Sequence, residues 1–358
     1  MGLDIRSAPE SMDAAWVTGV MESAGVARGA RVTSVEFLGY IGTGQTGANA
    51  RFAMTWDDPA GRPATFVTKF PSRDAQAATT AFANGAYLKE CTFYRSIAPT
   101  VRIRTPRTYA VLYDADTPDF VIVMEDAVGC QQGDQLVGLT VDQAALAAAE
   151  AVQLHAPRWG DPALAPLLGV ADVPTQVVGF EMIYNLTLGP FLERLGWRLD
   201  ADVVEVIQRF AGSTKEWITA TATPHTVVHM DYRPDNLLFG VEPGAPSLVV
   251  VDWQTASVGP AMNDLAYLIG GGFLPEQRAV VERDLVEHYR TRLTAEGIAY
   301  DAETCWRDYR VATLWGIALT VIATVLAAET ERGNEMFIAM AQRHGRHAID
   351  LDALSLLR

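Results

Sequence analysis

The sequence predicts an α+β protein with two lobes: an antiparallel five-stranded sheet plus a helix in residues 1–126, and a mainly helical lobe in residues 127–358. Short apolar runs that end at turn residues fill the first third of the chain. Patterns with helical spacing dominate after Thr140. Residues 229–236 are an exception to this helical pattern. They form a polar stretch between two short apolar runs, which is typical of a tight loop between buried strands.

The composition indicates an acidic globular protein. The chain has 358 residues, with 28 Lys plus Arg against 43 Asp plus Glu, and a formal net charge of −15. Its length leaves room for two lobes with ample core. A surface of this sign repels nucleic acid and anionic membranes, so we expect neither as a partner, and it suits a cationic substrate.

Cysteine usage and the N-terminal residues predict a cytoplasmic protein. The cysteines form no Cys-x-x-Cys pair, which argues against a disulfide framework or a zinc site; they are Cys91, Cys130 and Cys305. Asp4, Arg6 and Glu10 interrupt the N-terminal segment, so it has no apolar signal core. Residues 311–328 are uncharged, but their Thr and Gly content and flanking charges predict a buried helix rather than a membrane span.

The first lobe opens with a helix and a hairpin. Apolar residues at helical spacing follow Ser11, a candidate N-cap, and predict a helix over residues 11–24. Strands are predicted at residues 31–38 and 51–56. The loop between them fits the pattern G-x-G-x-x-G at Gly42, Gly44 and Gly47. A dinucleotide-binding loop opens a helix, so a strand on each side favours a hairpin instead, and a merely flexible Gly-rich hairpin is the alternative.

The third strand, residues 64–70, contains a lysine among apolar residues. Burying the ammonium of Lys69 is costly unless it meets an anion. A helix is predicted over residues 75–97, where the chain is free of proline. On this helix Glu90 lies three residues from both Tyr87 and Phe93, toward an apolar side, which favours it over the neighbouring acids and bases as an inward-facing charge.

Two further strands and then helices complete the prediction. Strands are expected at residues 104–113 and 119–124, and the lobe boundary falls near residue 127. Helices are expected at 141–155, 175–194, 201–221, 275–296, 302–328 and 334–357. His155, at the end of the first of these, is expected to pack or cap rather than to catalyse.

The polar loop carries a carboxylate, Asp231, and a carboxamide five residues later, Asn236. A second acid, Asp252, follows another short apolar run. A proton acceptor together with two oxygen ligands for a hard cation are the groups that phosphoryl transfer requires. The alternative interpretation is that Asp231 and Asn236 are ordinary turn formers and that His229 is a core histidine.

At these residues the chain resembles the kinase superfamily, in particular the aminoglycoside phosphotransferase-like small-molecule kinases. The match is His-x-Asp-x-x-x-x-Asn at His229, Asp231 and Asn236, followed by Asp252 sixteen residues later. Gly-x-x-x-x-Asp-Leu-Ala, with Asp264, resembles the family segment whose acid holds the catalytic loop. The chain departs from the family at Met230, where glycine is usual.

The resemblance implies a protein-kinase-like bilobal fold and a set of roles. Asp231 would act as the catalytic base, and Arg233 would stabilise charge on the γ-phosphate, although a surface arginine beside Asp235 is the alternative. Asn236 and Asp252 would hold Mg²⁺. ATP would be bound by the Gly-rich hairpin, by the Lys69 and Glu90 pair and by a hinge at residues 124–128; these residues are Gly42, Gly44, Gly47, Lys69, Glu90, Met124, Glu125, Asp126 and Ala127.

The implied activity is ATP-dependent transfer of a phosphate to a hydroxyl of a small molecule. Around Asp231 the motif is closest to the kinase domains associated with acyl-CoA dehydrogenases, so a hydroxyacyl-CoA kinase is an alternative. A nucleotide-binding module without transfer is a second alternative, motivated by Met230. The protein-kinase branch is disfavoured, because no Ala-Pro-Glu segment follows Asp252. The identity of the acceptor, the choice between ATP and GTP, and a homodimer stay open.

Overall fold

The computed structural model describes residues 3–42, 46–220, 224–327 and 329–357. The chain forms two compact units: Met1–Pro99, Arg104–Cys130 and Glu242–Thr255 make up the first, and Thr100–Ile103, Gln131–Val241 and Ala256–Arg358 the second. Residues 242–255, with Asp252, thus belong to the first unit, although the sequence prediction put them in the helical lobe. The reason is local, because strand β9 (Leu248–Val250) runs beside Arg104, whose carbonyl accepts a hydrogen bond from the Val250 N–H at 2.8 Å.

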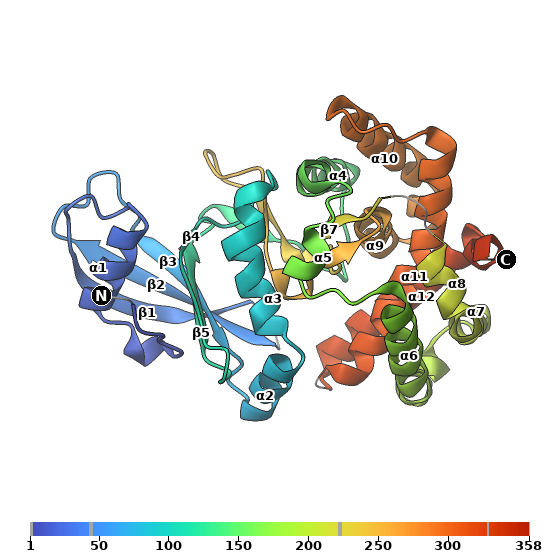
Figure 1. Ribbon diagram of the computed structural model, residues 1–358, viewed down its shortest axis with the longest axis horizontal. Coiled ribbons are helices and arrows are strands. Elements are labelled where there is room, and N and C mark those ends of the chain that lie inside the picture. Colours follow the sequence, from blue (N-terminus) through green and yellow to red (C-terminus); the bar gives the residue numbers. More distant parts are fainter. Residues whose placement is uncertain (1–2, 43–45, 221–223, 328, 358) are drawn as a thin grey trace. The chain divides into compact units, whose positions relative to one another are not determined.

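The first unit contains a five-stranded antiparallel sheet with the strand order β1-β2-β3-β5-β4 (Figure 1). Its strands are β1 Val32–Ile41, β2 Gly47–Trp56, β3 Thr65–Pro71, β4 Thr108–Tyr113 and β5 Phe120–Glu125. The predicted five-stranded antiparallel sheet is confirmed. The glycine-rich hairpin is tighter than expected, because β1 continues to Ile41 and β2 already begins at Gly47.

Helix α1 (Ala14–Ser23) covers one face of this sheet (Figure 1). Its N-cap is Asp13 rather than Ser11, because the Asp13 carboxylate accepts a hydrogen bond from the Trp16 N–H at 2.8 Å. Phe66 and Phe70 of β3 join the apolar core that α1 makes with the sheet. Since neighbouring strand residues point to opposite faces, Lys69 faces away from this core.

The single helix predicted over residues 75–97 is broken in the structure. Its parts are α2 Ala75–Ala83, α3 Ala86–Thr92 and a π-helical turn at Phe93–Ile97. The break lies at Gly85, which has a φ of 72° and so takes a left-handed conformation that glycine adopts without strain. Tyr87 of α3 packs on Phe120 of β5, with ring centroids 4.4 Å apart, and this contact holds α3 against the sheet.

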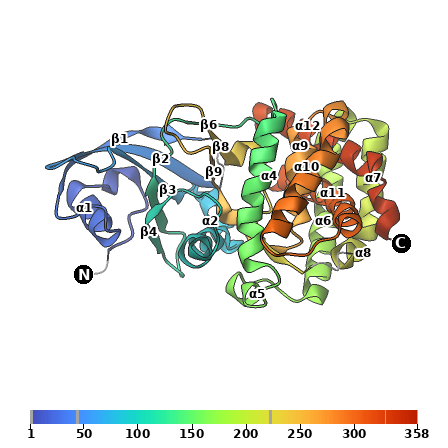
Figure 2. The same cartoon turned by 90° about the horizontal axis from the view of Figure 1, so that it is seen from above.

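The second unit is mainly helical, as predicted. Its helices are α4 Val141–His155, α5 Leu164–Leu167, α6 Val173–Leu195, α7 Ala201–Phe210, α8 Thr214–Thr219, α9 Met262–Gly272, α10 Pro275–Ala295, α11 Ala302–Leu326 and α12 Glu331–Asp350. The short strands outside the sheet are β6 Cys130–Gln132, β7 Thr226–Val228, β8 Leu237–Gly240, β9 and β10 Ser257–Gly259. Helices α4 and α10 lie side by side (Figure 2). The sequence interpretation missed α9, which proves important for the candidate site.

Helix α11 contains the uncharged stretch noted in the sequence. It is long and apolar enough to cross a membrane, and 67% of its most apolar window is buried inside the protein. It packs against α6, α9 and α12. The expected buried helix is therefore what the structure shows.

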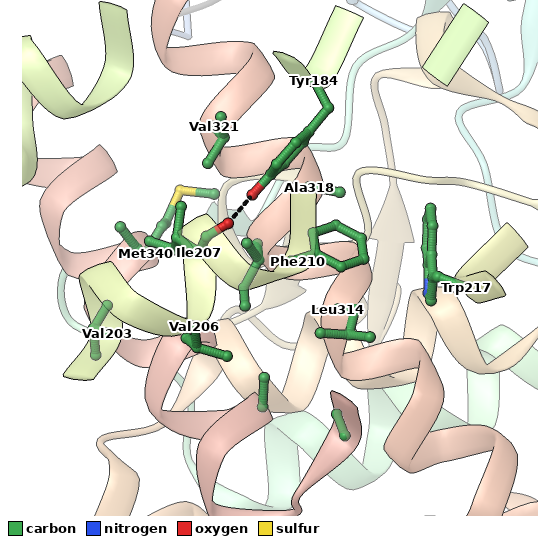
Figure 3. Packing of buried hydrophobic residues seen from close by; sticks show 14 of the residues in the cluster. Tyr184, Val203, Val206, Ile207, Phe210, Trp217, Leu314, Ala318, Val321 and Met340 are labelled. Atoms are coloured by element: carbon green, nitrogen blue, oxygen red, sulfur yellow. Dashed lines mark hydrogen bonds between the residues drawn. The ribbon is translucent and has the colours of Figure 1, made fainter. Parts of the chain in front are cut away.

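An aromatic core joins α6, α7 and α8 to α11 (Figure 3). Tyr184, Phe210 and Trp217 are buried in it and pack on one another, with Tyr184 and Phe210 centroids 5.1 Å apart. The Tyr184 hydroxyl is satisfied locally, because it donates a hydrogen bond to the Ile207 carbonyl at 3.0 Å. The core therefore buries this hydroxyl with a partner, and its side chains pack against residues of α11 such as Leu314 and Ala318.

Candidate active site

In the first unit, Lys69 gathers two carboxylates around its ammonium. Its Nζ lies 2.7 Å from Glu90 Oε2 of α3 and 2.8 Å from Asp252 Oδ1. Lys69 is 5% exposed and Glu90 is 1% exposed, whereas the Asp252 side chain is 26% exposed. Glu90 is therefore the acid of this helix that contacts Lys69, and its part in nucleotide binding stays a prediction.

Electrostatics keep this lysine charged. Burial lowers the pKa of Lys69, but the attraction of Asp252 and Glu90 outweighs that effect and raises the pKa above its usual value. A buried ammonium is stable when a carboxylate compensates its charge, and Lys69 has two such partners. Lys69 is therefore a buried, charged ammonium on the face of β3 opposite the apolar core made with α1.

Asp252 is positioned by its own backbone and by its neighbour Trp253. It follows β9 directly and has a φ of 67°, a left-handed conformation that aspartate tolerates better than most residues. The Trp253 ring stacks on Phe93 with centroids 3.7 Å apart and planes 3° from parallel. Phe93 lies three residues after Glu90, so this stack fixes Asp252 relative to the end of α3.

In the second unit, Asp264 of α9 holds the start of the polar loop. Its two carboxylate oxygens accept hydrogen bonds from the backbone N–H groups of His229 (2.7 Å) and Met230 (2.8 Å). The expected role of Asp264 in fixing the loop is therefore confirmed. His155 contacts Asp264 in turn, since its Nε2 lies 3.1 Å from Asp264 Oδ2. The other ring nitrogen of His155, Nδ1, lies 2.8 Å from the Tyr289 hydroxyl.

Met230 takes the backbone conformation that explains why glycine is usual at its position. Its φ is 67°, which costs a residue with a side chain about 1–2 kcal/mol. Both of its backbone polar groups are bonded: the N–H donates to Asp264, and the carbonyl accepts a hydrogen bond from the Trp315 indole N–H at 2.9 Å. The methionine therefore strains the loop locally, while both of its backbone polar groups keep a partner.

Asp231 and Asn236 come together, as their spacing suggests. Asn236 Nδ2 donates to the backbone carbonyl of Asp231 at 2.8 Å and to its carboxylate at 2.9 Å. Arg233 Nε lies 3.1 Å from Asp231 Oδ1, and its Nη1 pairs with Asp235. Because the Asn236 amide nitrogen is used in this way, its oxygen is the atom suited to a cation.

The remaining predicted nucleotide-binding residues are distributed over the first unit. Met124 and Glu125 end β5, and Asp126 and Ala127 follow it. Glu125 pairs with Arg104, and Asp126 pairs with Arg51 at 2.9 Å. Of the predicted glycines, Gly42 has a φ of 74° and Gly47 starts β2, while Gly44 lies outside the described residues.

The donors suit a magnesium ion that binds together with a nucleotide. Among the described residues, no three His, Cys, Asp or Glu side chains form a group that could hold a metal alone. Mg²⁺ usually takes one or two protein carboxylates and completes its coordination with phosphates and water. Asp252 and the Asn236 amide oxygen are oxygen ligands of this kind.

The fold and these two groups of residues define a protein-kinase-like phosphotransferase. The chain belongs to the phosphotransferase enzyme family, whose model matches residues 46–308, well over half of the chain. This confirms the family resemblance found in the sequence. The comparison with curated proteins gives no match.

Solved structures show the same fold. A candidate aminoglycoside phosphotransferase from Ralstonia eutropha superposes with a TM-score of 0.50 at 17% identity, over 93% of this chain and 98% of that one. An ethanolamine kinase from Plasmodium vivax superposes with a TM-score of 0.54 at 11% identity, over 87% of this chain and 81% of that one.

Three supporting residues were not foreseen from the sequence. Trp315 fixes the Met230 carbonyl, Tyr289 fixes His155, and Gln135 donates its N–H to Asp235 Oδ1 at 2.8 Å. Each comes from a segment far from the loop in sequence, and none belongs to a motif. Trp315 alone carried a signal, since a tryptophan within an uncharged helix needs a partner for its N–H when it is buried.

Proposed function

We propose that this protein is an ATP- and Mg²⁺-dependent kinase that transfers the γ-phosphate to a hydroxyl group of a small molecule. The observation that carries the proposal is the Asp231 carboxylate, which Asn236 and Arg233 hold in a loop whose backbone is fixed by Asp264. An aspartate fixed in this way is suited to orient a hydroxyl and take its proton. The family membership supports the phosphotransferase class.

In the proposed mechanism each named residue has one task. Asp231 binds the acceptor hydroxyl and accepts its proton as the phosphate bond forms. Asn236 and Asp252 hold Mg²⁺, which neutralises charge on the phosphates when it is bound. Lys69, kept in place by Glu90, binds phosphate oxygens.

The remaining contacts to the nucleotide, those to adenine and those to the phosphates beyond Lys69, are assigned to residues of the first unit. The backbone at residues 124–127 is proposed to bind adenine, and the hairpin glycines to let backbone N–H groups approach the phosphates. Arg233 bonds to the carboxylates of both Asp231 and Asp235, so we assign it to holding the loop and to moderating charge beside the base. Small hydroxylated compounds are the acceptor class.

Replacing Asp231 with asparagine tests the proposal. The amide keeps the size of the side chain but cannot accept the proton, so transfer is expected to fall by about 10² to 10⁴ while MgATP affinity stays unchanged. Product formation is measured against a panel of aminoglycosides, sugars, choline-like alcohols and hydroxyacyl-CoAs, and affinity by calorimetry. Asp284→Asn, on an exposed position of α10, is the matched control.

The result also separates an enzyme from a nucleotide-binding module. Equal transfer by the wild type and by Asp231→Asn would remove Asp231 as the base. MgATP binding without transfer to any acceptor in the panel would favour the module. The strained but intact conformation of Met230 supports the enzyme, because the loop keeps its hydrogen bonds despite the missing glycine.

A further inference from the structure

The peptide group between Met230 and Asp231 is held at both ends. Its carbonyl, that of Met230, accepts a hydrogen bond from the indole N–H of Trp315 at 2.9 Å. Its N–H, that of Asp231, donates to His229 Nδ1 at 3.3 Å. Because this planar group leads directly into Asp231, its orientation sets the direction in which the Asp231 side chain leaves the backbone.

Met230 is a strained residue of this loop. Its φ is 67°, and a residue with a Cβ favours the right-handed and extended regions over this one. Such a conformation persists only when the surrounding structure fixes it. Two contacts from outside the loop do so here: Asp264 of α9 accepts the Met230 N–H at 2.8 Å, and Trp315 of α11 donates to the Met230 carbonyl. Relaxation of Met230 would turn the peptide group that follows it, and Asp231 with it.

The Trp315 ring is itself held in the second unit. The ring of Trp217, from α8, lies nearly parallel to it, with centroids 6.2 Å apart and planes 11° from parallel. Trp217 is tied to α11 in turn, because its indole N–H donates to the Val311 carbonyl at 3.2 Å. Val311 and Trp315 are four residues apart and so lie on the same side of α11. The donor to the Met230 carbonyl therefore comes from the packed aromatic core.

We propose that Trp315 is a positioning residue that holds the strained Met230 peptide group and thereby directs the Asp231 carboxylate toward the acceptor hydroxyl. The inference rests on the proposed function of Asp231 as the base. Asn236 and Arg233 also contact this carboxylate, but both belong to the loop and would turn with it. The indole N–H comes from α11, so it ties the backbone beside the base to the helical core.

Trp315→Phe removes the indole N–H and keeps an aromatic ring beside Trp217. The Met230 carbonyl then loses its partner on α11. The expected result is a fall in kcat of about tenfold, because a small misplacement of a catalytic group slows the chemical step. The KM for MgATP is expected to change by less than about twofold, because the residues assigned to the nucleotide are unaltered.

Trp16→Phe is the matched control. It makes the same chemical change in a buried tryptophan of α1, where the indole N–H donates to the Asp4 carbonyl at 3.0 Å, outside the proposed catalytic loop. It is expected to leave kcat unchanged. Equal falls in kcat in Trp16→Phe and Trp315→Phe would show a general effect of a lost indole on the fold and would overturn the inference.

A double variant tests the link to the strain at Met230. Glycine adopts the left-handed conformation without strain, so Met230→Gly removes the tendency of the peptide group to turn away. Trp315→Phe is therefore expected to lower kcat less in the Met230→Gly background than in the wild type, so that the two changes are not additive. A fall that is as large or larger in the glycine background would overturn the inference.

Hydrogen exchange tests the contact without an acceptor. The indole N–H signal of Trp315 is identified in NMR spectra by its absence from Trp315→Phe. The ring is only half-buried, so slow exchange of this proton with solvent is expected to depend on its bond to the Met230 carbonyl. Exchange as fast as that of free tryptophan would overturn the contact and the inference with it.

The outcomes distinguish the two proposals. A wild type that transfers phosphate, together with an unchanged kcat in Trp315→Phe, overturns the positioning role and leaves the proposed function standing. A wild type that transfers phosphate to no acceptor in the panel removes the proposed function, and the positioning role falls with it.

Discussion

Lys69 and Asp252 form an ion pair of 2.8 Å although 183 residues separate them in the chain. Together with Glu90 they make a charge group in the first unit that is preformed without any ligand. Its balance is one cation against two carboxylates, so it carries net negative charge. A divalent cation beside Asp252 would offset this excess, which agrees with the proposed role of Asp252 as a magnesium ligand.

Lys69→Met is expected to abolish turnover and also to destabilise the protein. Glu90 is 1% exposed, and removing the lysine leaves its carboxylate buried without compensation, at a cost of about 3–5 kcal/mol. Urea unfolding measures the loss. The Lys69→Met and Glu90→Gln double variant is expected to recover much of the stability but none of the turnover. A single variant as stable as the wild type would contradict the burial argument.

Met230→Gly is expected to be tolerated. Glycine removes the left-handed strain of about 1–2 kcal/mol, while the greater freedom of the unfolded chain offsets about 1 kcal/mol of that gain. The free energy of unfolding should therefore change by less than about 1 kcal/mol, and kcat should be retained. A large loss of activity would mean that the methionine side chain itself contributes to the site.

Gly316→Ala is expected to destabilise the protein by about 1–3 kcal/mol. An added Cβ would lie 2.2 Å from His344 Nδ1 and 2.4 Å from its Cγ, so α11 and α12 must move apart. Gly179→Ala on α6 is the matched control, because a Cβ there meets nothing within 4 Å and alanine favours a helix. Thermal unfolding of both variants tests the prediction; equal Tm values would show that the packing of His344 against Gly316 is not tight.

Stability is expected to fall as the pH drops below about 6.5. Burial lowers the pKa values of His344 and His347 well below the usual value, and positive neighbours, among them Arg278, add to this effect. Below the pKa that these histidines have in the unfolded chain, the unfolded chain therefore binds more protons than the native protein. Each histidine then lowers the free energy of unfolding by up to about 1.4 kcal/mol for each pH unit.

Glu282 and Tyr309 also face His347, and Glu282 acts in the opposite direction, because burial raises its pKa and its native form binds protons more readily. The net slope is measured by urea unfolding between pH 7.5 and 5.5. A midpoint that does not move would mean that the two effects cancel or that both histidines titrate normally.

Local patterns were sufficient for the sheet and for the principal site residues. Lys69 could be recognised because a charge stood in an apolar strand, and Asp231 with Asn236 because a loop between two buried strands limits their separation. The Asp264 contact followed from a motif. Each of these signals lies within a few residues of the group that it identifies.

Other features depend on contacts between distant segments. Helix α9 is nearly all apolar and ends in three consecutive glycines, so its composition does not predict a helix. Burial in the second unit stabilises it instead. Nothing in the sequence shows that His344 stacks on Tyr267. The grouping of Asp252 with the sheet likewise depends on the hydrogen bond from Val250 to Arg104.

The stacked rings of Phe93 and Trp253 give the first unit a mechanical property. Phe93 directly follows α3 and Trp253 adjoins Asp252, while Glu90 and Asp252 share the Lys69 ammonium. Two parallel links, one aromatic and one ionic, therefore connect the helix to the turn after β9. A displacement of the helix would therefore move that turn as well, so the Lys69 ammonium and the Asp252 carboxylate are held together as one rigid group.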